Sequence, residues 1–564
     1  MKNRFIIFLI GLFLFCLPLQ TAAAEGSIPS FPALAYGDVT INQQPAAAGI
    51  EVTAKVDGKV VGNILISEPG KYGGAGTKSK LLITGDGFSG KNVEFYLTGK
   101  QGSIALNQVK AKEELYWGAG EVKKIDFNVT VEEPVQNPPT TGGTGGGAVQ
   151  PAPGNNQDTI VDGIAEDLVS VDNQNGKANV SFLESKDLGL EKEQVLTVKM
   201  TEDVEELNTQ LSLGMLNSMK ANDNTLQIET NRATYSLPVS KLDIDNILDQ
   251  FGAGTDPNKI QMNVKITEPS ESDIQVLEQV ATEHEVTLLV KPISFTIQAK
   301  VNNQSFEVKD FNGYVERMIK LSKDVDASKV TTAVVISPDG TMSHVPTKII
   351  EKNGEYFVVI NSRTNSFYTV IHNEIGFQDV ENHWSKDYIN SMASKLIING
   401  VDENHFEPNR SITRAEFAAI INRALGLKYE ETDQSFTDVP ETKWYYEPVL
   451  TSYKYGLIKG YQEGTFRPND SITREQAMAI IAQAMKLTEL KVTMDEKTAA
   501  NVVGKFTDYQ SIGDWATQSV AITVKNGVVD GFADNSLKPK NQITRAEAAK
   551  MIHNTLVSTD LITK

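Results

Sequence analysis

Alternating apolar and polar residues recur through the first quarter of the chain, after an apolar N-terminal run. The alternating apolar positions are Val52, Ala54 and Val56, then Val93, Phe95 and Leu97, then Ile125, Phe127, Val129 and Val131. A period of two residues places the apolar side chains of a strand on one face. Short alternating runs between Gly-rich turns therefore predict that residues 25–133 form an all-β sandwich.

The alternation stops at residues 134–157, which read PVQNPPTTGGTGGGAVQPAPGNNQ. This composition predicts a Pro/Gly-rich linker. Beyond it, residues 158–373 return to short apolar runs that indicate strands, with hairpin turns predicted at residues 338–340 (Pro-Asp-Gly) and 353–354 (Asn-Gly).

One stretch of this middle region, residues 205–221, has a helical period instead. Its apolar residues on one helical face are Leu207, Leu211, Met215 and Met219. Their spacing of four residues predicts a helix. We therefore expect residues 158–373 to form an α+β domain built mostly of strands.

From residue 374 onward the apolar period is that of helices, and the pattern occurs three times, over residues 374–430, 434–488 and 504–558. Each copy has a tryptophan, a glycine sixteen residues later and an arginine fourteen residues after the glycine. In chain order these are Trp384, Gly400 and Arg414, then Trp444, Gly460 and Arg474, then Trp515, Gly531 and Arg545. Equal spacing indicates structural repeats, each of two helices joined by a loop. One helical hairpin is too small to bury its apolar stripe, so we expect the three to share an all-α core.

The apolar N-terminal run has the features of an export signal. Basic residues precede an apolar stretch over residues 5–19, and three alanines follow at 22–24. This pattern predicts a secretory signal peptide over residues 1–24, with an apolar run too short for a membrane-spanning helix. The single cysteine, Cys16, lies within it, so we expect no disulfide and no thiolate metal site in the rest of the chain.

The composition limits the partners of the protein. With a formal net charge of −19, the chain does not attract nucleic acids or other polyanions through its overall field. An anionic partner must therefore be held by individual cations. The sequence contains neither a His-Glu-x-x-His nor a Gly-x-Ser-x-Gly motif, and its histidines are scattered. We expect no cofactor, no metal site and no catalytic residues.

The residues around each repeated arginine predict the start of a helix. A threonine precedes each arginine, and an acid or amide follows that threonine by three residues. The pairs are Thr413 and Glu416, Thr473 and Gln476, and Thr544 and Glu547. This spacing is that of a capping box, in which each of the two side chains accepts a hydrogen bond from the backbone N–H of the other residue.

Helix capping does not account for the arginine, because a cation in the first turn opposes the helix dipole by about 0.3–1 kcal/mol. In one interpretation, the guanidinium and free backbone N–H groups at the helix start form an anion site. In the other, the guanidinium forms a salt bridge within the protein to an acid such as that of the Phe-x-Asp segment that opens a repeat. These acids are Asp379, Asp438 and Asp508. Both interpretations are compatible with the sequence.

The repeated tryptophans and glycines also allow two interpretations each. A tryptophan at the start of a helix is usually a core residue, whereas an exposed one offers a flat apolar face to a sugar ring. The glycines either end the first helices in the left-handed conformation or let a ligand approach the backbone.

These motifs resemble S-layer homology domains, which usually occur in sets of three. The resemblance rests on Phe-x-Asp-Val, tryptophan, Gly-aromatic, Phe-x-Pro and Ile-Thr-Arg-Ala-Glu at matching spacings, with departures at Val401, Gln476, Tyr509 and Leu537. It implies a helical bundle of pseudo-three-fold symmetry whose grooves bind a pyruvylated secondary cell-wall polysaccharide. Carried over, it places the repeated arginines on the ligand carboxylate, with the repeated tryptophans, aspartates and glycines nearby.

The combined expectation is a secreted, non-catalytic protein of the bacterial cell surface. Its C-terminal repeats attach it to an anionic wall polysaccharide, and its N-terminal regions are displayed in an S-layer lattice or as binding units. Two alternatives remain open. One is a wall-anchored enzyme with its catalytic site within residues 158–373, and the other is an adhesin that binds through residues 25–133.

Overall fold

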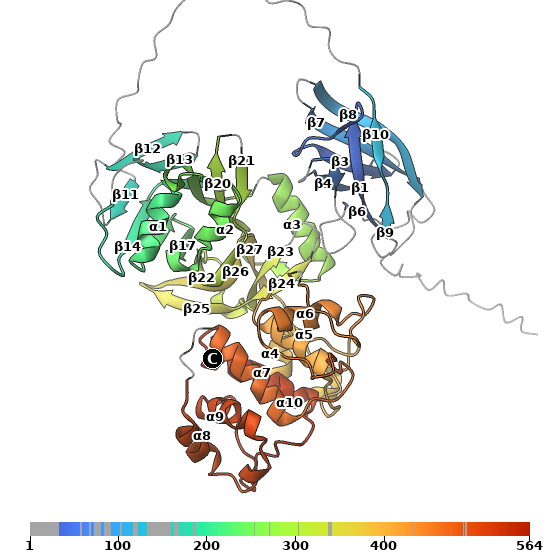
Figure 1. The fold of residues 1–564 in the computed structure, drawn as a ribbon, viewed down its shortest axis with the longest axis vertical. Helices are drawn as coiled ribbons and strands as arrows, with labels where there is room; N and C mark the ends of the chain where they lie inside the picture. Colours follow the sequence, from blue (N-terminus) through green and yellow to red (C-terminus); the bar gives the residue numbers. More distant parts are fainter. Residues whose placement is uncertain are drawn as a thin grey trace, which may run out of the picture. The chain divides into compact units, whose positions relative to one another are not determined.

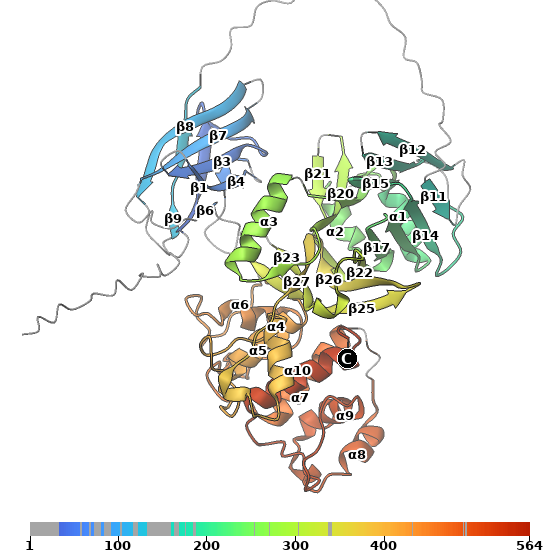
Figure 2. The same ribbon diagram turned by 180° about the vertical axis from the view of Figure 1, so that it is seen from behind.

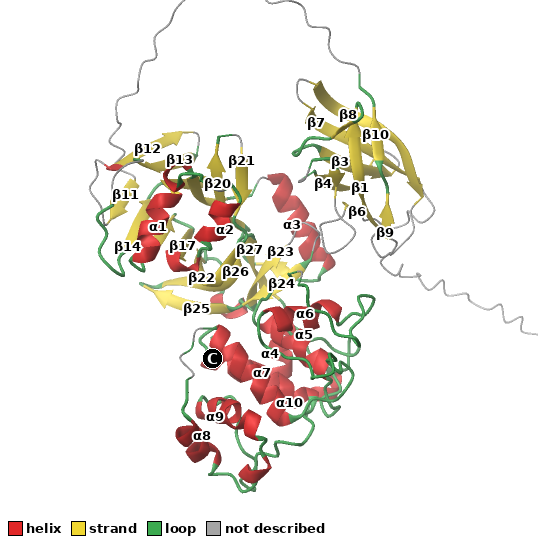
Figure 3. Cartoon of the chain, viewed as in Figure 1, coloured by secondary structure: helices red, strands yellow, loops and turns green. Residues whose placement is uncertain are grey.

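The structure is a computed structural model that describes residues 33–131 and 159–563, apart from short gaps within both ranges. The predicted signal peptide, the predicted linker and the predicted turn at 338–340 lie outside the described residues. The chain divides into two compact units, residues 1–144 and 145–564. Strands dominate the N-terminal and middle regions and helices the C-terminal region, as predicted (Figures 1 and 3).

The described part of the first unit consists of strands in two sheets. They are β1 (Ala33–Ile41), β2 (Gln44–Pro45), β3 (Glu51–Val56), β4 (Lys59–Leu65), β5 (Lys71–Tyr72), β6 (Leu81–Ile83), β7 (Asn92–Gln101), β8 (Ile104–Tyr116), β9 (Val122–Lys124) and β10 (Phe127–Val129). In one sheet β2, β5, β6, β9 and β10 all pair with β1, and the other has the order β4-β3-β7-β8. Alternating residues such as Val52, Phe95 and Phe127 are buried in one shared core.

The middle region contains two larger sheets with helices packed against them (Figure 1). Its strands are β11 (Thr159–Asp162), β12 (Val169–Gln174), β13 (Lys177–Phe182), β14 (Val195–Met200), β15 (Glu206–Ser212), β16 (Thr225–Glu229), β17 (Ala233–Pro238), β18 (Gln261–Thr267), β19 (Thr287–Leu288), β20 (Ile293–Val301), β21 (Gln304–Glu307), β22 (Asp310–Lys320), β23 (Thr332–Ile336), β24 (Met342–Val345), β25 (Thr347–Lys352), β26 (Glu355–Thr364) and β27 (Phe367–His372), and its α-helices are α1 (Leu213–Ala221), α2 (Ile244–Asp249) and α3 (Glu271–Glu283).

The two sheets of the middle region have different strand orders. One runs β11-β14-β16-β17-β22-β26-β25, and the other runs β12-β13-β15-β18-β20-β27-β23-β24, with β19 and β21 at its sides. The turn between β25 and β26 is the predicted Asn353-Gly354, and both residues have positive φ, at 55° and 77°. Two left-handed residues in a row match the right-handed twist of a hairpin.

The helix predicted over residues 205–221 is wrong in its first half. Residues 206–212 form β15, and only residues 213–221 form a helix, α1. Leu207 and Leu211 lie four residues apart, which places them on one face of a strand as well as of a helix. β15 pairs with β13 on one side and β18 on the other, so tertiary pairing decides between the two patterns. The Ser212 side chain then caps α1 by accepting from Met215 N at 3.1 Å.

The C-terminal region is built from helices joined by loops. The helices are α4 (Lys386–Ser394), α5 (Arg414–Ala424), α6 (Tyr446–Lys454), α7 (Arg474–Leu487), α8 (Glu496–Val503), α9 (Thr517–Lys525) and α10 (Arg545–Ser558), with short 3₁₀ turns at Gln378–Val380, Tyr509–Ser511 and Asp514–Ala516. One continuous cluster of buried apolar residues runs through all three repeats, as the shared apolar stripes predicted. α8 lies in the segment that separates the second and third repeats.

Three isoleucines link the repeats in a closed cycle. Ile412 N donates to Ile543 O at 3.1 Å, Ile543 N to Ile472 O at 3.2 Å, and Ile472 N to Ile412 O at 3.0 Å. Each isoleucine comes two residues before a repeated arginine. This cycle brings the starts of α5, α7 and α10 together, although they lie far apart in the sequence.

The middle region also contacts the repeats. The Tyr314 hydroxyl of β22 donates to Leu425 O, directly after α5, at 2.8 Å. Lys348 of β25 pairs with Asp560 at 2.5 Å, close to the end of the chain. Figures 1 and 2 show β24 and β25 beside the helical region from opposite sides. Residues 145–564 therefore form one unit with two parts.

Candidate functional site

Each repeated arginine is the first residue of a helix capped by the preceding threonine. At α5, Thr413 Oγ1 accepts from Glu416 N at 3.2 Å, and Glu416 Oε2 accepts from Thr413 N at 2.8 Å. The same reciprocal hydrogen bonds occur at α7, where Gln476 replaces the acid, and at α10. A capping box therefore starts all three helices.

The backbone donors beside each arginine are not free for a ligand. Arg414 N donates to Asp470 O at 2.9 Å and Ala415 N to Pro468 O at 3.0 Å, and both acceptors belong to the following repeat. The starts of α7 and α10 donate in the same way to residues 539–541 and 408–410. The free N–H groups that the anion-site interpretation assumed are therefore absent at these three described helix starts, so only the guanidinium part of that interpretation stays a prediction.

The arginine side chains enter the junctions between repeats. At the first junction Arg414 reaches repeat 2, at the second Arg474 reaches repeat 3, and at the third Arg545 reaches repeat 1. Arg414 Nε donates to Phe466 O at 2.9 Å, and Arg545 Nε donates to Phe406 O at 2.8 Å. The guanidinium groups also lie over aromatic rings of the repeats that they reach. The three arginines are equally enclosed, at 7%, 8% and 7% exposure, and burial lowers the pKa of each.

The charged partners of the three arginines differ. At the second junction Arg474 Nη1 lies 3.2 Å from Glu547 Oε1, and at the third Arg545 Nη1 lies 3.6 Å from Glu416 Oε1. In both cases the acid is the capping-box residue of the repeat that the arginine reaches. At the first junction this residue is Gln476, and no carboxylate of the described residues lies within ion-pair distance of Arg414.

The aspartates of the Phe-x-Asp segments bind backbone and not the arginines. Asp379 accepts from the N–H groups of Phe406 and Glu407 at 2.9 and 2.7 Å. Asp438 and Asp508 accept in the same way from the corresponding loops of their own repeats. Both oxygens of each carboxylate thereby hold the loop that leads to the next helix. Salt bridges within the protein do form at Arg474 and Arg545, but with Glu547 and Glu416 and not with these aspartates.

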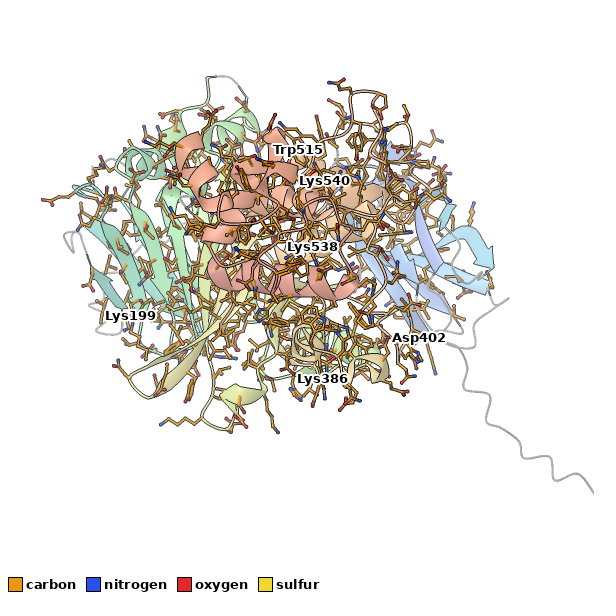
Figure 4. All side chains as sticks on the ribbon, turned by 90° about the horizontal axis from the view of Figure 1, so that it is seen from below. Lys199, Lys386, Asp402, Trp515, Lys538 and Lys540 are labelled. Atoms are coloured by element: carbon orange, nitrogen blue, oxygen red, sulfur yellow. The ribbon has the colours of Figure 1, made fainter. Side chains whose placement is uncertain are left out.

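The three tryptophans lie on the surface. Trp384, Trp444 and Trp515 are 57%, 61% and 60% exposed, so the interpretation that they are core residues is wrong. A Cβ added at Gly513 would lie 2.6 Å from Trp515 Nε1 and 3.4 Å from Lys540 Nζ, which places both side chains beside one backbone segment. Figure 4 shows Trp515 and Lys540 close together on the helical region.

The repeated glycines do not adopt the left-handed conformation predicted for a helix C-cap. Instead, Gly400, Gly460 and Gly531 lie against the phenylalanine rings that open their repeats, where an added Cβ would come within 2.6, 2.3 and 2.5 Å of a ring carbon. Close packing of the ring against the backbone therefore requires glycine. The left-handed residues that follow the first helices of repeats 2 and 3 are Gly456 and Gly527, which come four positions earlier.

One buried acid at the second junction is not among the predicted site residues. Glu475, directly after Arg474, is 4% exposed. Its carboxylate accepts from Gly513 N at 3.0 Å and lies 2.6 Å from Lys540 Nζ. Alanine stands at this place in the other two repeats, so this departure from the repeat was the only signal in the sequence.

Two further observations concern metal binding and membrane-spanning helices. Among the residues that the structure describes, no group of three or more His, Cys, Asp or Glu side chains is arranged to hold a metal ion. Within the same ranges, no helix is long and apolar enough to cross a membrane.

Comparison with known proteins identifies the repeats. Residues 376–418, 435–478 and 505–549 each match the S-layer homology domain. The chain carries three S-layer homology domains. Proteins similar to part of this chain include the S-layer protein sap of Bacillus anthracis, which is 33% identical over 181 residues, or 32% of this chain and 21% of the relative. From these domains and relatives it follows that the protein is secreted and associated with the cell wall at the cell surface.

Two further relatives are named as enzymes. An amylopullulanase of Thermoanaerobacterium thermosulfurigenes is 30% identical over 382 residues, which is 68% of this chain and 18% of the relative. Exoglucanase XynX of Acetivibrio thermocellus is 37% identical over 187 residues, which is 33% of this chain and 17% of the relative. The chain thus spans about a fifth of the length of these relatives.

These relatives correct the expectation of a non-catalytic protein. The match to the amylopullulanase is longer than the whole segment from residue 376 to the last residue, so it must include much of the middle region. The middle region, and not only the repeats, is therefore similar to part of a protein named as an enzyme. The lack of a short catalytic motif does not exclude a glycosidase, because such an enzyme needs only two suitably placed carboxylates.

Proposed function

We propose that the S-layer homology domains attach the protein to an anionic polysaccharide of the cell wall. The observation that carries this proposal is the repeated combination of an enclosed guanidinium at the helix start and an exposed tryptophan. A guanidinium binds a carboxylate through two parallel N–H donors, and an indole face covers the apolar face of a sugar ring. Placed cations of this kind are required because the net charge of −19 repels anions at long range.

The anionic group in this proposal is the carboxylate of a pyruvate ketal on a secondary cell-wall polysaccharide. Such a ketal fixes one carboxylate and one methyl group on a sugar ring. The carboxylate meets the guanidinium, and the methyl group meets the aromatic rings around it, such as Tyr461 and Phe466 beside Arg414. A neutral glycan would enclose the cation further without supplying a counter-ion, which is unfavourable.

We further propose that the three domains are related by a pseudo-three-fold axis through the isoleucine cycle. The cyclic hydrogen bonds and the reach of each arginine into the next repeat support this arrangement. In it, the repeated aspartates and glycines shape the junction loops, and the arginines and tryptophans line the junctions at which the glycan can bind. Residues 25–133, as a β-sandwich beyond the linker 134–157, would then be displayed away from the wall.

A sedimentation experiment tests the attachment. The purified protein is mixed with cell walls that carry a pyruvylated polysaccharide, and with the same walls after mild acid has removed the ketal. We expect the protein to sediment with the first walls only. Binding of an unrelated peptidoglycan-binding protein to both preparations controls for damage to the walls. Equal sedimentation with both preparations would contradict the proposal.

A second candidate function is that of a wall-attached enzyme acting on a polysaccharide. The observation that favours it is the amylopullulanase match, which extends into the middle region. In this candidate the catalytic carboxylates lie within residues 158–373, and the repeats keep the enzyme at the cell surface.

An assay of reducing ends tests the second candidate. The purified protein is incubated with pullulan, amylose, xylan and a β-glucan, beside heat-denatured protein as the control. The candidate predicts release of reducing ends from an α-glucan by the native protein alone. Release from none of the four substrates would rule the candidate out, without affecting the proposed attachment.

A further inference from the structure

We propose that the anionic group of the glycan binds at the first junction, because Gln476 leaves Arg414 without an acid there. At the other two junctions Glu547 and Glu416 neutralise the arginines and so prevent this binding. This inference rests on the proposed attachment to an anionic wall polysaccharide and names the arginine that makes the contact. It gives Gln476 a role in ligand selection, beyond the capping box that it shares with the two glutamates.

The second junction is already neutralised. Arg474 lies 3.2 Å from Glu547, and its Nη2 donates to Asp530 O at 3.0 Å. Glu547 is fixed in this position because its other oxygen accepts from Thr544 N at 2.8 Å. A ligand carboxylate would have to displace an acid that also caps a helix.

The third junction is neutral as well. Glu416 lies 2.7 Å from Arg410 Nη2 and 3.6 Å from Arg545 Nη1. Arg410 has a second acid, Glu407, at 2.8 Å from its Nε. Arg545 also donates from Nη2 to Asn399 O at 2.7 Å. The charges of two guanidinium groups and two carboxylates therefore cancel, and Arg545 has few N–H donors left for a ligand.

The first junction differs because its capping-box residue carries no charge. Gln476 Oε1 accepts from Thr473 N at 3.1 Å, and its Nε2 lies 3.5 Å from the Tyr461 hydroxyl. Arg414 donates from Nε to Phe466 O, and its two terminal nitrogens have no hydrogen-bond partner among the described residues. These nitrogens are the pair that a carboxylate engages in bidentate fashion.

The other charges near Arg414 do not replace the missing acid. Asp438 uses both oxygens for backbone N–H groups, and Arg467 is paired with Glu463 at 2.7 Å. Asp470 is exposed and lies beyond ion-pair distance of Arg414. An enclosed cation without a counter-ion destabilises the protein, and an external carboxylate removes this penalty. The first junction thus gains more from an anionic ligand than the two junctions that supply their own acid.

The substitution Gln476→Glu tests this inference with little risk to folding, because glutamate fills the same place in the other two capping boxes. The new carboxylate is expected to pair with Arg414. We expect binding to walls that carry the pyruvate ketal to weaken by at least about tenfold. Without walls, the melting temperature of the variant is expected to rise, because an unpaired enclosed cation gains a partner.

Glu547→Gln is the matched control, because it makes the reverse change at the second junction and also keeps a residue that fits the capping box. We expect this variant to bind the walls at least as well as the parent. Equal binding by the parent and Gln476→Glu, or a comparable loss in folded Glu547→Gln, would overturn the inference and leave the proposed attachment intact. Failure of the parent itself to distinguish ketal-bearing from ketal-free walls would overturn both.

Discussion

At the scale of the residue, one amide in place of a carboxylate separates three otherwise similar sites. Arg414, Arg474 and Arg545 are enclosed to the same degree, but only Arg414 has no carboxylate opposite its guanidinium among the described residues. The sequence predicted the capping boxes because their pattern spans four consecutive residues. It did not predict the partners of the arginines, because Arg414 reaches Phe466, 52 residues along the chain, and because the acids expected as partners hold backbone loops.

Gly460→Ala tests whether the repeated glycines serve close packing. Its Cβ would lie 2.3 Å from Phe436 Cε1 and 2.9 Å from Thr465 O, so an aromatic ring and a backbone carbonyl would both have to move. We expect the free energy of unfolding to fall by about 1–3 kcal/mol in urea denaturation. Gly376→Ala is the control, since its Cβ would meet only Asn390 Nδ2 at an ordinary 3.6 Å. Equal losses in both variants would refute the packing role.

At the scale of the element, the first helix of every repeat is followed by one left-handed residue at the same place. Gly456 and Gly527 have φ of 70° and 68°, and Leu396 has φ of 62°. Glycine is the usual sign of this conformation, so the sequence directed attention to the repeated Gly400 instead. A leucine gives no such sign. Its side chain packs against the apolar cluster formed by α3, β23 and β24 of the middle region, and this contact accounts for a leucine in a strained conformation.

Two substitutions at Leu396 separate the strain from the packing. Leu396→Ala removes the packing and keeps the strain, whereas Leu396→Gly removes both. The left-handed conformation costs about 1–2 kcal/mol for a residue with a Cβ. We expect both variants to be less stable than the parent and the alanine variant to be less stable than the glycine variant by about 1 kcal/mol, measured by urea denaturation. The opposite order would show that strain at this position is unimportant.

At the scale of the whole molecule, the middle region and the repeats of residues 145–564 contact each other directly. Tyr314 and Lys348 bond to the helical part, and Leu396 packs into the middle region. The sequence predicted both parts from their apolar periods. It did not predict this contact, because the contact is made by single residues that belong to no periodic pattern of apolar positions. The amylopullulanase match includes much of the middle region, so this region also has a counterpart in another protein.

The stability of the unit formed by residues 145–564 is expected to fall in acid. His344 of β24 is 2% exposed, and burial lowers its pKa from 6.5 to about 3. A histidine with a lowered folded-state pKa stabilises the folded state above pH 6.5, and this contribution is lost as the pH falls from 6.5 towards 3. From pH 7 to pH 5 the loss is about 2 kcal/mol. We expect His344→Asn to show a correspondingly smaller fall in unfolding free energy, followed by circular dichroism of the helices. An unchanged pH dependence would contradict this role of His344.

The most direct test of the account is the number of anionic glycan sites on each chain. Calorimetric titration of the purified protein with a pyruvylated oligosaccharide of the cell wall measures this number. The account predicts one site per chain in the parent protein and none in Arg414→Gln, while the same oligosaccharide without its ketal gives no binding. Three equivalent sites, or one site that survives in folded Arg414→Gln, would contradict it.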